Sequence, residues 1–423
     1  MLQTAYIREN KELVIERLKK RNIDANQIVN DILALDEKRK KTQQDLDALL
    51  AESNQIAKQI GDLFKSGKAA EANELKEKTT QIKEQSNTLK EEQNQINNDL
   101  MQLLYQVPNV PNEIVPAGKS DADNEIVFSE GNVPTLHEGA LSHWDLAKKY
   151  DLIDFELGVK ITGAGFPVYK GQGARLQRAL ITFFLDEAVK SGYQEIIPPL
   201  MINEASGYGT GQLPDKEGQM YYMQADDLYM IPTAEVPITN LYRDVILKTD
   251  ELPIKNVGYT PCFRREAGSY GKDVRGLNRL HQFDKVEIVQ IQHPDQSYQT
   301  LDDMVSHVKG LLNKLGLPYR VSKLCGGDLG FTSALTYDME VYSAAQEKWL
   351  EVSSISNFET FQANRLKCRF KDENGKTQLV HTLNGSALAL PRIVASLLEN
   401  NQTPEGIKIP EVLVPYTGFD MIK

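Results

Sequence analysis

The chain has 423 residues, 41% of them hydrophobic and 25% charged, with a formal net charge of −11. This length exceeds what one hydrophobic core usually serves, so we expect two domains. The acidic balance excludes a uniformly basic nucleic-acid-binding protein but allows local basic patches.

The three cysteines, Cys262, Cys325 and Cys368, are far apart. They fit neither a disulfide framework nor a zinc site of paired cysteines, which indicates a reducing compartment. There is no signal-peptide pattern and no apolar run of about 18 residues, so we expect a cytoplasmic protein.

The first predicted feature is a long helical hairpin at about 26–104. This stretch has no proline, and its apolar residues recur at alternating spacings of four and three. That is the heptad pattern of a coiled coil. The break between Gly61 and Gly67 predicts a turn that folds the two helices into an antiparallel pair. We assign the hairpin to an N-terminal domain, 1–110.

The hairpin has two competing interpretations. A dimerisation coiled coil or spacer is one, because a mixture of lysine and glutamate is usual on any exposed helix. The other is a basic stripe that contacts a phosphate backbone. Residues 1–110 carry a net charge of −1, which leaves −10 for the other 313 residues. The candidate phosphate contacts are Lys38, Arg39, Lys40, Lys41, Lys58, Lys65 and Lys68.

Prolines 108, 111 and 116 mark a linker, after which short strand-like runs alternate with a few helices. Strands are expected at 193–197, 228–231, 256–263, 285–292, 319–322, 337–342, 349–355 and 363–370. Helices are expected at 175–191, 302–315 and 391–399. Consecutive strands with few crossover helices predict an antiparallel sheet flanked by helices, so domain 111–423 is assigned to the α+β class.

The segment from Arg264 to Glu287 carries the strongest functional signal. It combines two arginines and an acid at 264–266, a glycine-rich stretch at 267–271, and then Arg279 and Phe283. Arginine suits bidentate contact with phosphate, and Phe283 offers a face on which a nucleobase could stack. A solvated turn between two strands is the alternative interpretation. His281 is expected to have a structural role, because a phosphate-binding segment needs no general base.

Three further polar clusters follow apolar segments. They are Thr233-Ala234-Glu235, the stretch 351–357, and the stretch 382–392, where a glycine turn is expected to lead into a helix that carries Arg392. Structural roles are also open: Thr233 and Ser386 as helix caps, Ser353 and Ser354 as turn hydroxyls, and Glu287 as a strand residue facing water. There is no P-loop, no GxGxxG after a strand and no metal-ligand spacing.

Together these segments resemble a known family. Residues 263–266 with 279–283 resemble motif 2 of class II aminoacyl-tRNA synthetases, 192–199 resemble motif 1, and 385–392 resemble motif 3. The helical hairpin, Thr233-Ala234-Glu235 and Asn384-Gly385-Ser386 narrow the resemblance to seryl-tRNA synthetases of the bacterial type. It covers essentially the whole chain.

The resemblance implies activation of L-serine by ATP to seryl-adenylate, then transfer of the seryl group to the 3′ end of tRNA-Ser. Whether a selenocysteine tRNA is also charged stays open. It further implies a homodimer formed through motif 1 near Pro199, and a hairpin that contacts the tRNA. Mg²⁺ is expected with ATP near Glu351 and Ser354. No zinc is expected, because Cys325 and Cys368 lie outside the motif positions that could bind it.

The resemblance also implies a role for each matching residue. ATP contacts are expected at Arg264, Arg265, Glu266, Leu280, Phe283, Glu351, Val352, Ser353, Ser354 and Arg392. Serine contacts are expected at Thr233, Ala234, Glu235, Glu287 and Ser386. The expected catalytic residues are Arg264 on the α-phosphate, Arg392 on the γ-phosphate, and Arg279 near the serine carboxylate or the adenylate phosphate.

Two alternatives belong to other classes. A synthetase-like protein that charges a carrier protein would be expected to lack the hairpin, which is present here. A coiled-coil scaffold with a degenerate catalytic domain would be expected to lack Arg264, Glu287 or Arg392, and all three are present.

Overall fold

A computed structural model of the chain describes residues 1–266 and 274–423. The glycine-rich stretch 267–271 therefore lies outside the described residues. The chain divides into a helical unit, residues 2–19 and 23–108, and a second unit that comprises residue 1, 20–22 and 109–423. Among the described helices, none combines the length and the apolarity that a membrane span requires.

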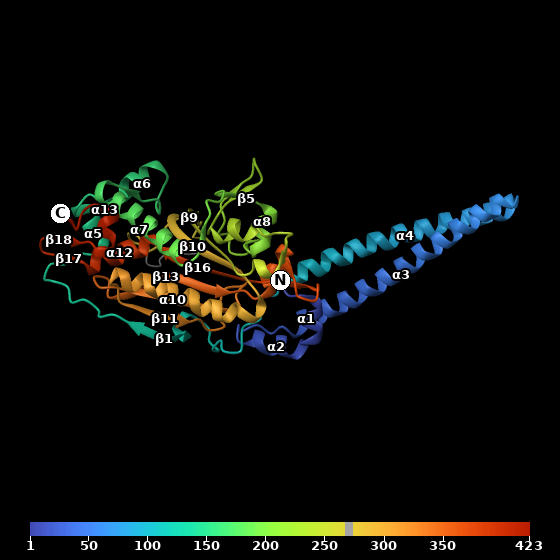
Figure 1. Cartoon of the computed structure of the whole chain (residues 1–423), viewed down its shortest axis with the longest axis horizontal. Coiled ribbons are helices and arrows are strands. Elements are labelled where there is room, and N and C mark those ends of the chain that lie inside the picture. Colours follow the sequence, from blue (N-terminus) through green and yellow to red (C-terminus); the bar gives the residue numbers. More distant parts are fainter. Residues whose placement is uncertain (267–273) are drawn as a thin grey trace. The chain divides into compact units, whose positions relative to one another are not determined.

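The helical unit is dominated by two long helices that lie side by side (Figure 1). Its helices are α1 (Thr4–Glu9), α2 (Lys11–Lys19), α3 (Asn26–Lys65) and α4 (Ala69–Leu104). The predicted antiparallel hairpin is confirmed, but its turn is at 66–68, because α3 continues through Gly61 to Lys65. At ~1.5 Å per residue, α3 is roughly 60 Å long.

The seam between α3 and α4 largely follows the predicted heptads. Buried seam residues are Ile32, Thr42, Leu46 and Ile56 on α3, and Ala72, Ile82, Ser86, Gln93, Ile96 and Leu100 on α4. Near the start of α3 the buried residues are Val29 and Asp36, whereas the apolar neighbours Ile28 and Leu35 are only half-buried. Asp36 can be buried because Arg8 and Arg39 pair with its carboxylate.

The second unit is built on an eight-stranded sheet with the order β1-β11-β12-β13-β16-β10-β9-β4. The strands are β1 (Glu125–Glu130), β4 (Gln194–Glu195), β9 (Ile254–Phe263), β10 (Gln282–Gln292), β11 (Tyr319–Lys323), β12 (Leu335–Ser343), β13 (Lys348–Asn357) and β16 (His381–Ala389). Neighbouring strands are antiparallel except β4 and β9, which run parallel. The predicted α+β architecture is confirmed.

Helices and small sheets surround this sheet (Figure 1). The helices are α5 (His143–Lys149), α6 (Phe155–Ile161), α7 (Gly171–Lys190), α8 (Glu204–Thr210), α9 (Glu235–Asn240), α10 (Ser297–Leu315), α11 (Thr360–Leu366), α12 (Leu390–Asn400) and α13 (Val414–Thr417). The remaining strands are β2 (Ile153–Asp154), β3 (Val168–Tyr169), β5 (Met201–Asn203), β6 (Tyr222–Met223), β7 (Leu228–Met230), β8 (Ile246–Lys248), β14 (Arg369–Lys371), β15 (Thr377–Leu379), β17 (Gln402–Thr403), β18 (Gly406–Lys408) and β19 (Met421–Ile422).

The hydrophobic core lies between one face of the main sheet and the helices α7, α10 and α12. Val286 and Ile288 of β10 point into it, together with Phe183 of α7, Met304 of α10 and Ile393 of α12, all at most 1% exposed. Because strand residues alternate between faces, the opposite face of the sheet is left free for polar side chains.

Two predictions of secondary structure are wrong. The strand expected at 363–370 is helix α11 followed by β14, because Phe361 and Leu366 are buried on one helix, which ends at the left-handed C-cap Lys367. The glycine turn expected at 385 is the middle of β16. A Cβ on Gly385 would lie 3.0 Å from the Ile355 side chain, so glycine serves close strand packing there.

Candidate active site

The polar face of the sheet is set by the two-residue period of its strands. On β10, Phe283, Lys285 and Glu287 share one face. Glu287 pairs with Ser386 on β16, and Asn384 of the same strand pairs with Ser356 on β13. Antiparallel register thus aligns side chains from three strands into one continuous polar surface.

A cavity of about 520 Å³ opens on this surface, a size suited to a small-molecule ligand. All of the residues predicted to bind ATP or serine line the cavity, with the exception of Ala234 and Arg265. Lys285, Asn384 and Ser356 also line it.

One end of the cavity is a buried pocket around Glu287, which is fully buried. The Lys285 ammonium lies 2.7 Å from one Glu287 carboxylate oxygen and donates to the Thr233 hydroxyl at 2.8 Å. Asn384 donates its amide to the other oxygen of Glu287 at 2.7 Å, and the Ser386 hydroxyl lies 3.4 Å from the carboxylate. Glu287 is therefore no strand residue facing water; it is a buried, fully partnered acid.

Glu235 is a second buried acid of this pocket. Burial raises the pKa of its carboxyl to about 7, the charge of Glu287 acts in the same direction, and the Gln362 hydrogen bond opposes them. Gln362 donates to Glu235 at 2.6 Å. The Thr233 hydroxyl accepts from the Glu235 backbone N–H at 3.2 Å, but the N-cap of α9 is Ala234, so Thr233 is not the cap of this helix. Two acids beside one lysine make this end of the cavity suited to an ammonium group.

Three arginines and an aromatic ring line the same cavity. The Arg264 guanidinium lies 5.2 Å from the centre of the Phe283 ring, a cation–π distance. Arg279 forms an ion pair with Glu266. Arg392, in the first turn of α12, donates to the Glu351 carbonyl at 2.7 Å. These three cations and the aromatic ring give the cavity a lining suited to phosphate oxygens.

Three residues from these segments do not line the cavity: Ala234, Arg265 and His281. Ala234 is fully buried outside the cavity lining. The Arg265 guanidinium lies 5.9 Å from the Tyr221 ring. His281 contacts the Tyr221 hydroxyl and the Arg264 carbonyl through Nδ1, and its ring stacks on Phe166. These contacts are structural ones.

The three predicted serine hydroxyls, Ser353, Ser354 and Ser386, differ in burial and in their place in the strands. The Ser353 side chain is buried and donates to the Ser386 carbonyl at 2.5 Å. Ser386 lies within β16 and therefore does not cap α12, whose N-cap is Ala389. Ser354 is only half-buried.

Sequence reasoning assigned no role to Lys285 or Asn384, although both lie close to predicted residues. Each is two positions from a predicted serine contact, Glu287 or Ser386, within a strand. The two-residue period would have placed them on the same face. That signal was available in the sequence.

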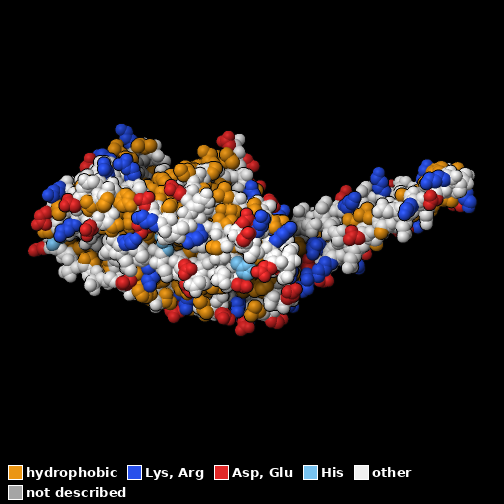
Figure 2. All heavy atoms as spheres, viewed as in Figure 1, with side chains coloured by type: hydrophobic (Ala, Val, Ile, Leu, Met, Phe, Trp, Pro, Cys, Tyr) orange, Lys and Arg blue, Asp and Glu red, His pale blue; other side chains and the backbone are white. Residues whose placement is uncertain are grey.

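On the hairpin, the predicted phosphate contacts lie among acidic neighbours. Lys38 pairs with Glu92 at 2.9 Å, Arg39 with Asp36 at 2.8 Å, and Lys68 with Glu71 at 3.2 Å. The view in Figure 2 shows blue and red side chains interspersed along the hairpin. The Lys38–Glu92 and Lys68–Glu71 pairs are exposed and weak, so they leave these lysines available to a stronger anion, whereas Arg39 pairs with the buried Asp36.

Family models match both units of the chain. The model described as the seryl-tRNA synthetase N-terminal domain matches residues 1–111. The model described as the tRNA synthetase class II core domain (G, H, P, S and T) matches residues 221–401.

Individual proteins match over the full length. A serine–tRNA ligase of Salinibacter ruber is 50% identical over 424 residues, covering 100% of this chain and 99% of the relative. One from Akkermansia muciniphila is 48% identical with the same coverage. Among solved structures, seryl-tRNA synthetase from Pyrococcus horikoshii complexed with ATP has a TM-score of 0.92 at 34% identity, covering 100% of this chain and 99% of that one. Cytoplasmic serine–tRNA ligase from Naegleria fowleri in complex with AMP has a TM-score of 0.88 at 28% identity, with the same coverage.

Proposed function

This chain belongs to the seryl-tRNA synthetase family, and from that premise we propose that it activates L-serine with ATP and transfers the seryl group to tRNA-Ser. One observation carries the proposal: a single cavity joins three arginines and Phe283 to a buried pocket with two acids. ATP and serine need these two environments side by side, because the serine carboxylate must reach the α-phosphorus.

In the first reaction, a serine carboxylate oxygen attacks the α-phosphorus and pyrophosphate leaves. The nucleophile is already ionised, so no protein base is required and catalysis consists of positioning and charge stabilisation. We assign Arg264 to the α-phosphate and Arg392 to the γ-phosphate. Arg279 would exchange its Glu266 partner for the serine carboxylate or the adenylate phosphate. Phe283 would stack on adenine, with Leu280 and Glu266 beside the base.

In the serine pocket, we assign Thr233 and Glu235 to the ammonium group and Glu287 to the side-chain hydroxyl, with Ser386 nearby. Lys285 would neutralise Glu287 and hold Thr233 in place. A pocket built to hydrogen-bond the hydroxyl rejects alanine by ~10⁴-fold or more, because alanine leaves buried polar groups unpaired. Threonine must be excluded by size, where one methyl group is worth only about 1–3 kcal/mol.

Mg²⁺ is assigned to the phosphate end, near Glu351 and Ser354. The donor set fits, since Mg²⁺ prefers oxygen ligands and usually takes one or two carboxylates together with substrate phosphates. Asp338, beside Ser354, has one buried carboxylate oxygen that finds no hydrogen-bond partner among the described residues. Burial raises the pKa of Asp338, and the charge of Glu351 adds to this effect. A bound Mg²⁺ would neutralise phosphate charge.

These assignments give each part of the chain a separate role. We propose that residues 1–110 form the tRNA-binding arm and residues 111–423 the catalytic domain. Lys38, Arg39, Lys40, Lys41, Lys58, Lys65 and Lys68 are the proposed phosphate contacts of the arm. A selenocysteine tRNA is proposed as a second acceptor. The compartment we propose is the cytoplasm, where tRNA charging supplies protein synthesis.

A homodimer formed around motif 1 is also proposed. Ile197 is 88% exposed, an unusual position for a large apolar side chain, and it lies beside the short edge strand β4. A second copy of the chain would cover it.

The decisive experiment is ATP–pyrophosphate exchange with serine, threonine or alanine as the amino acid. We expect rapid exchange with serine, and at least ~10⁴-fold lower kcat/KM with alanine. Exchange that does not depend on serine, or its complete absence, would overturn the assignment. Charging of a carrier protein in place of tRNA would favour the alternative acceptor.

A further inference from the structure

Helix α12 carries two charged residues that share one face. Arg392 stands in its first turn and Glu399 one residue before its end. They are seven residues apart, which is close to two full turns, so both point in the same direction. Arg392 lines the cavity, whereas Glu399 is fully buried outside it.

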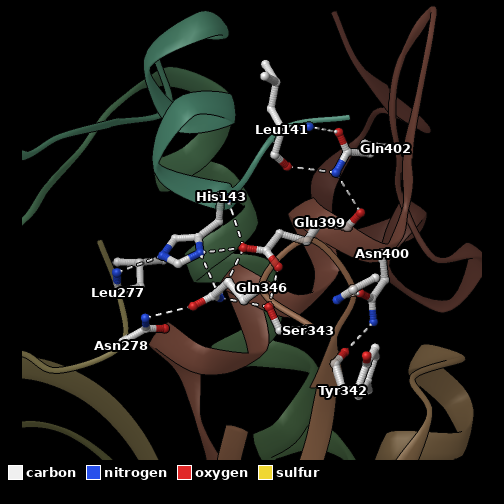
Figure 3. Close-up of polar contacts among 11 residues, drawn as sticks. Leu141, His143, Leu277, Asn278, Tyr342, Ser343, Gln346, Glu399, Asn400 and Gln402 are labelled. Atoms are coloured by element: carbon white, nitrogen blue, oxygen red, sulfur yellow. Dashed lines mark hydrogen bonds and ion pairs between the residues drawn. The ribbon is translucent and has the colours of Figure 1, made fainter. Parts of the chain in front are cut away.

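The Glu399 carboxylate is completely enclosed by hydrogen-bond donors (Figure 3). One oxygen accepts from the His143 backbone N–H at 2.9 Å, from His143 Nδ1 at 2.7 Å and from Gln346 Nε2 at 3.1 Å. The other accepts from the Ser343 hydroxyl. Burial opposes ionisation, but these hydrogen bonds outweigh it and hold the pKa of Glu399 below its ordinary value. A buried anion at a helix C-terminus is unfavourable, so its surroundings must compensate.

His143 extends this network to motif 2. Because Nδ1 donates to Glu399, the neutral ring presents Nε2 as an acceptor, and the Leu277 backbone N–H donates to it at 2.9 Å. The approach is close: a Cβ on Gly276, whose φ is +66°, would lie 2.2 Å from His143 Nε2. Figure 3 shows His143 between Glu399 and Leu277.

Two further contacts secure the neighbouring residue, Asn278. Its side-chain amide donates to Gln346 Oε1 at 2.8 Å, and its carbonyl accepts from Arg392 Nε at 3.1 Å. The pair Leu277–Asn278 is thus held at three points. Each of them leads to α12, directly through Arg392 or indirectly through Glu399.

We propose that His143, Gln346 and Glu399 are positioning residues that hold Leu277–Asn278 against α12. We call this set of hydrogen bonds the lock. The lock fixes the following residues, Arg279 and Leu280, relative to Arg392. This inference rests on the proposed function, in which Leu280 lies beside the adenine base and Arg392 binds the γ-phosphate. Loss of the lock should therefore weaken ATP binding. Serine binding should change less, because Arg279 is the one proposed serine contact that follows the locked pair, whereas the others lie on different segments.

Paired substitutions at His143 test the lock. In His143→Asn, the amide nitrogen can replace Nδ1 and still donate to Glu399, but no acceptor remains for Leu277. In His143→Gln, the amide oxygen can replace Nε2 and still accept from Leu277. We expect His143→Asn to raise the KM for ATP about tenfold in pyrophosphate exchange, since one buried N–H loses its acceptor. His143→Gln should recover most of this loss, and the KM for serine should change less than about twofold in both.

His307→Asn is the matched control. His307 is a partly buried histidine of α10 that contacts the Ser191 hydroxyl, far from the cavity lining. Its substitution should leave both KM values unchanged. A second variant, Gly276→Ala, pushes His143 and Leu277 apart from the motif 2 side and should raise the KM for ATP as His143→Asn does. Direct titration of each folded variant with ATP in the absence of serine should show the same loss of affinity.

The outcomes separate the lock from the proposed function. If the unsubstituted protein shows no serine-dependent exchange, the proposed function fails and the lock fails with it. If exchange is normal and His143→Asn binds ATP like the unsubstituted protein, only the lock is wrong. Equal increases in the KM values of ATP and serine, or the same ATP effect in His307→Asn, would show a general structural disturbance and also overturn it.

Discussion

Glu235 and Glu287 occupy the same buried pocket, and the negative charge of Glu287 helps to raise the pKa of the Glu235 carboxyl to about 7. Burial is the larger cause, and Gln362, Lys285 and Arg264 act in the opposite direction. Near neutral pH, the free protein therefore holds Glu235 as a mixture of its neutral and charged forms. Only the charged form can pair with the serine ammonium.

This pKa predicts the pH dependence of serine binding. As pH falls below about 7, Glu235 takes up a proton, and the KM for serine should rise by up to about tenfold per pH unit. Above about pH 8 it should level off. Pyrophosphate exchange at saturating ATP measures this profile. Glu235→Gln should raise the KM for serine and flatten the profile, whereas a flat profile in the unsubstituted protein would contradict the role of Glu235.

A second prediction concerns the buried ion pair of Lys285 and Glu287. Lys285→Met leaves the Glu287 charge buried without its cation, and the free energy of unfolding should fall by about 3–5 kcal/mol. Urea denaturation measures this change. The double variant Lys285→Met/Glu287→Gln should recover much of the stability, because the uncompensated charge is gone, while serine activation remains lost. If the double variant is no more stable than the single one, the charge of Glu287 is not the cause.

Adjacent arginines offer a matched test of the phosphate assignment. Arg264 lines the cavity, while the neighbouring Arg265 lies over Tyr221. We expect Arg264→Ala to lower the kcat of exchange by ~10²–10³, the usual effect of removing a group that stabilises transition-state charge. Arg265→Ala should change kcat less than about tenfold. Equal losses in the two variants would show that Arg265 also acts on ATP.

The sequence predicts the architecture well because long periodic patterns dominate it. The heptads of 26–104 give the hairpin, and Phe283 and Glu287 lie on one face of a single strand, β10. Errors fall where a local signal competes with tertiary packing. Gly385 was interpreted as a turn residue because glycine favours turns, but the strand needs it to pack against Ile355.

The parts of the site that the sequence did not reveal depend on contacts between distant segments. Lys285 could have been found from its position two residues before Glu287. The link between His143 and Glu399 could not, since 256 residues separate them and neither lies in a motif that suggests the other. Only the packing of α5 against α12 brings them together.

The exposed side chain of Ile197 gives a prediction about assembly. If a second copy covers it, Ile197→Asp places a charge in an apolar interface and should shift the protein toward monomers. Sedimentation velocity over a range of concentrations measures the shift. Ile161→Asp, at a residue 72% exposed on α6, is the control and should leave the assembly unchanged. A monomeric unsubstituted protein would exclude the homodimer.

The hairpin can be shortened without disturbing its base. Across the seam, Lys38 pairs with Glu92 at 2.9 Å and Lys78 with Glu52 at 2.8 Å, so Thr42 and Glu91 lie roughly opposite each other. Removal of residues 43–90, with a short glycine linker in their place, therefore keeps the N-terminal turns of α3 paired with the C-terminal turns of α4. The cavity lies wholly within residues 212–392, so its lining is not affected.

If the hairpin binds tRNA, this deletion should separate the two reactions. Serine-dependent pyrophosphate exchange should stay within about twofold of the full chain, because no ATP or serine contact is removed. Charging of tRNA-Ser should fall by roughly 100-fold or more, since several phosphate contacts are lost together.

Charge reversal at Lys58 and Lys65 should give a smaller loss of tRNA charging, and this loss should grow as the salt concentration is lowered, because these contacts are electrostatic. Unchanged charging after the deletion would refute the arm's role. If the deletion instead converted dimers to monomers, the hairpin would be a dimerisation element, as its heptads alone allow.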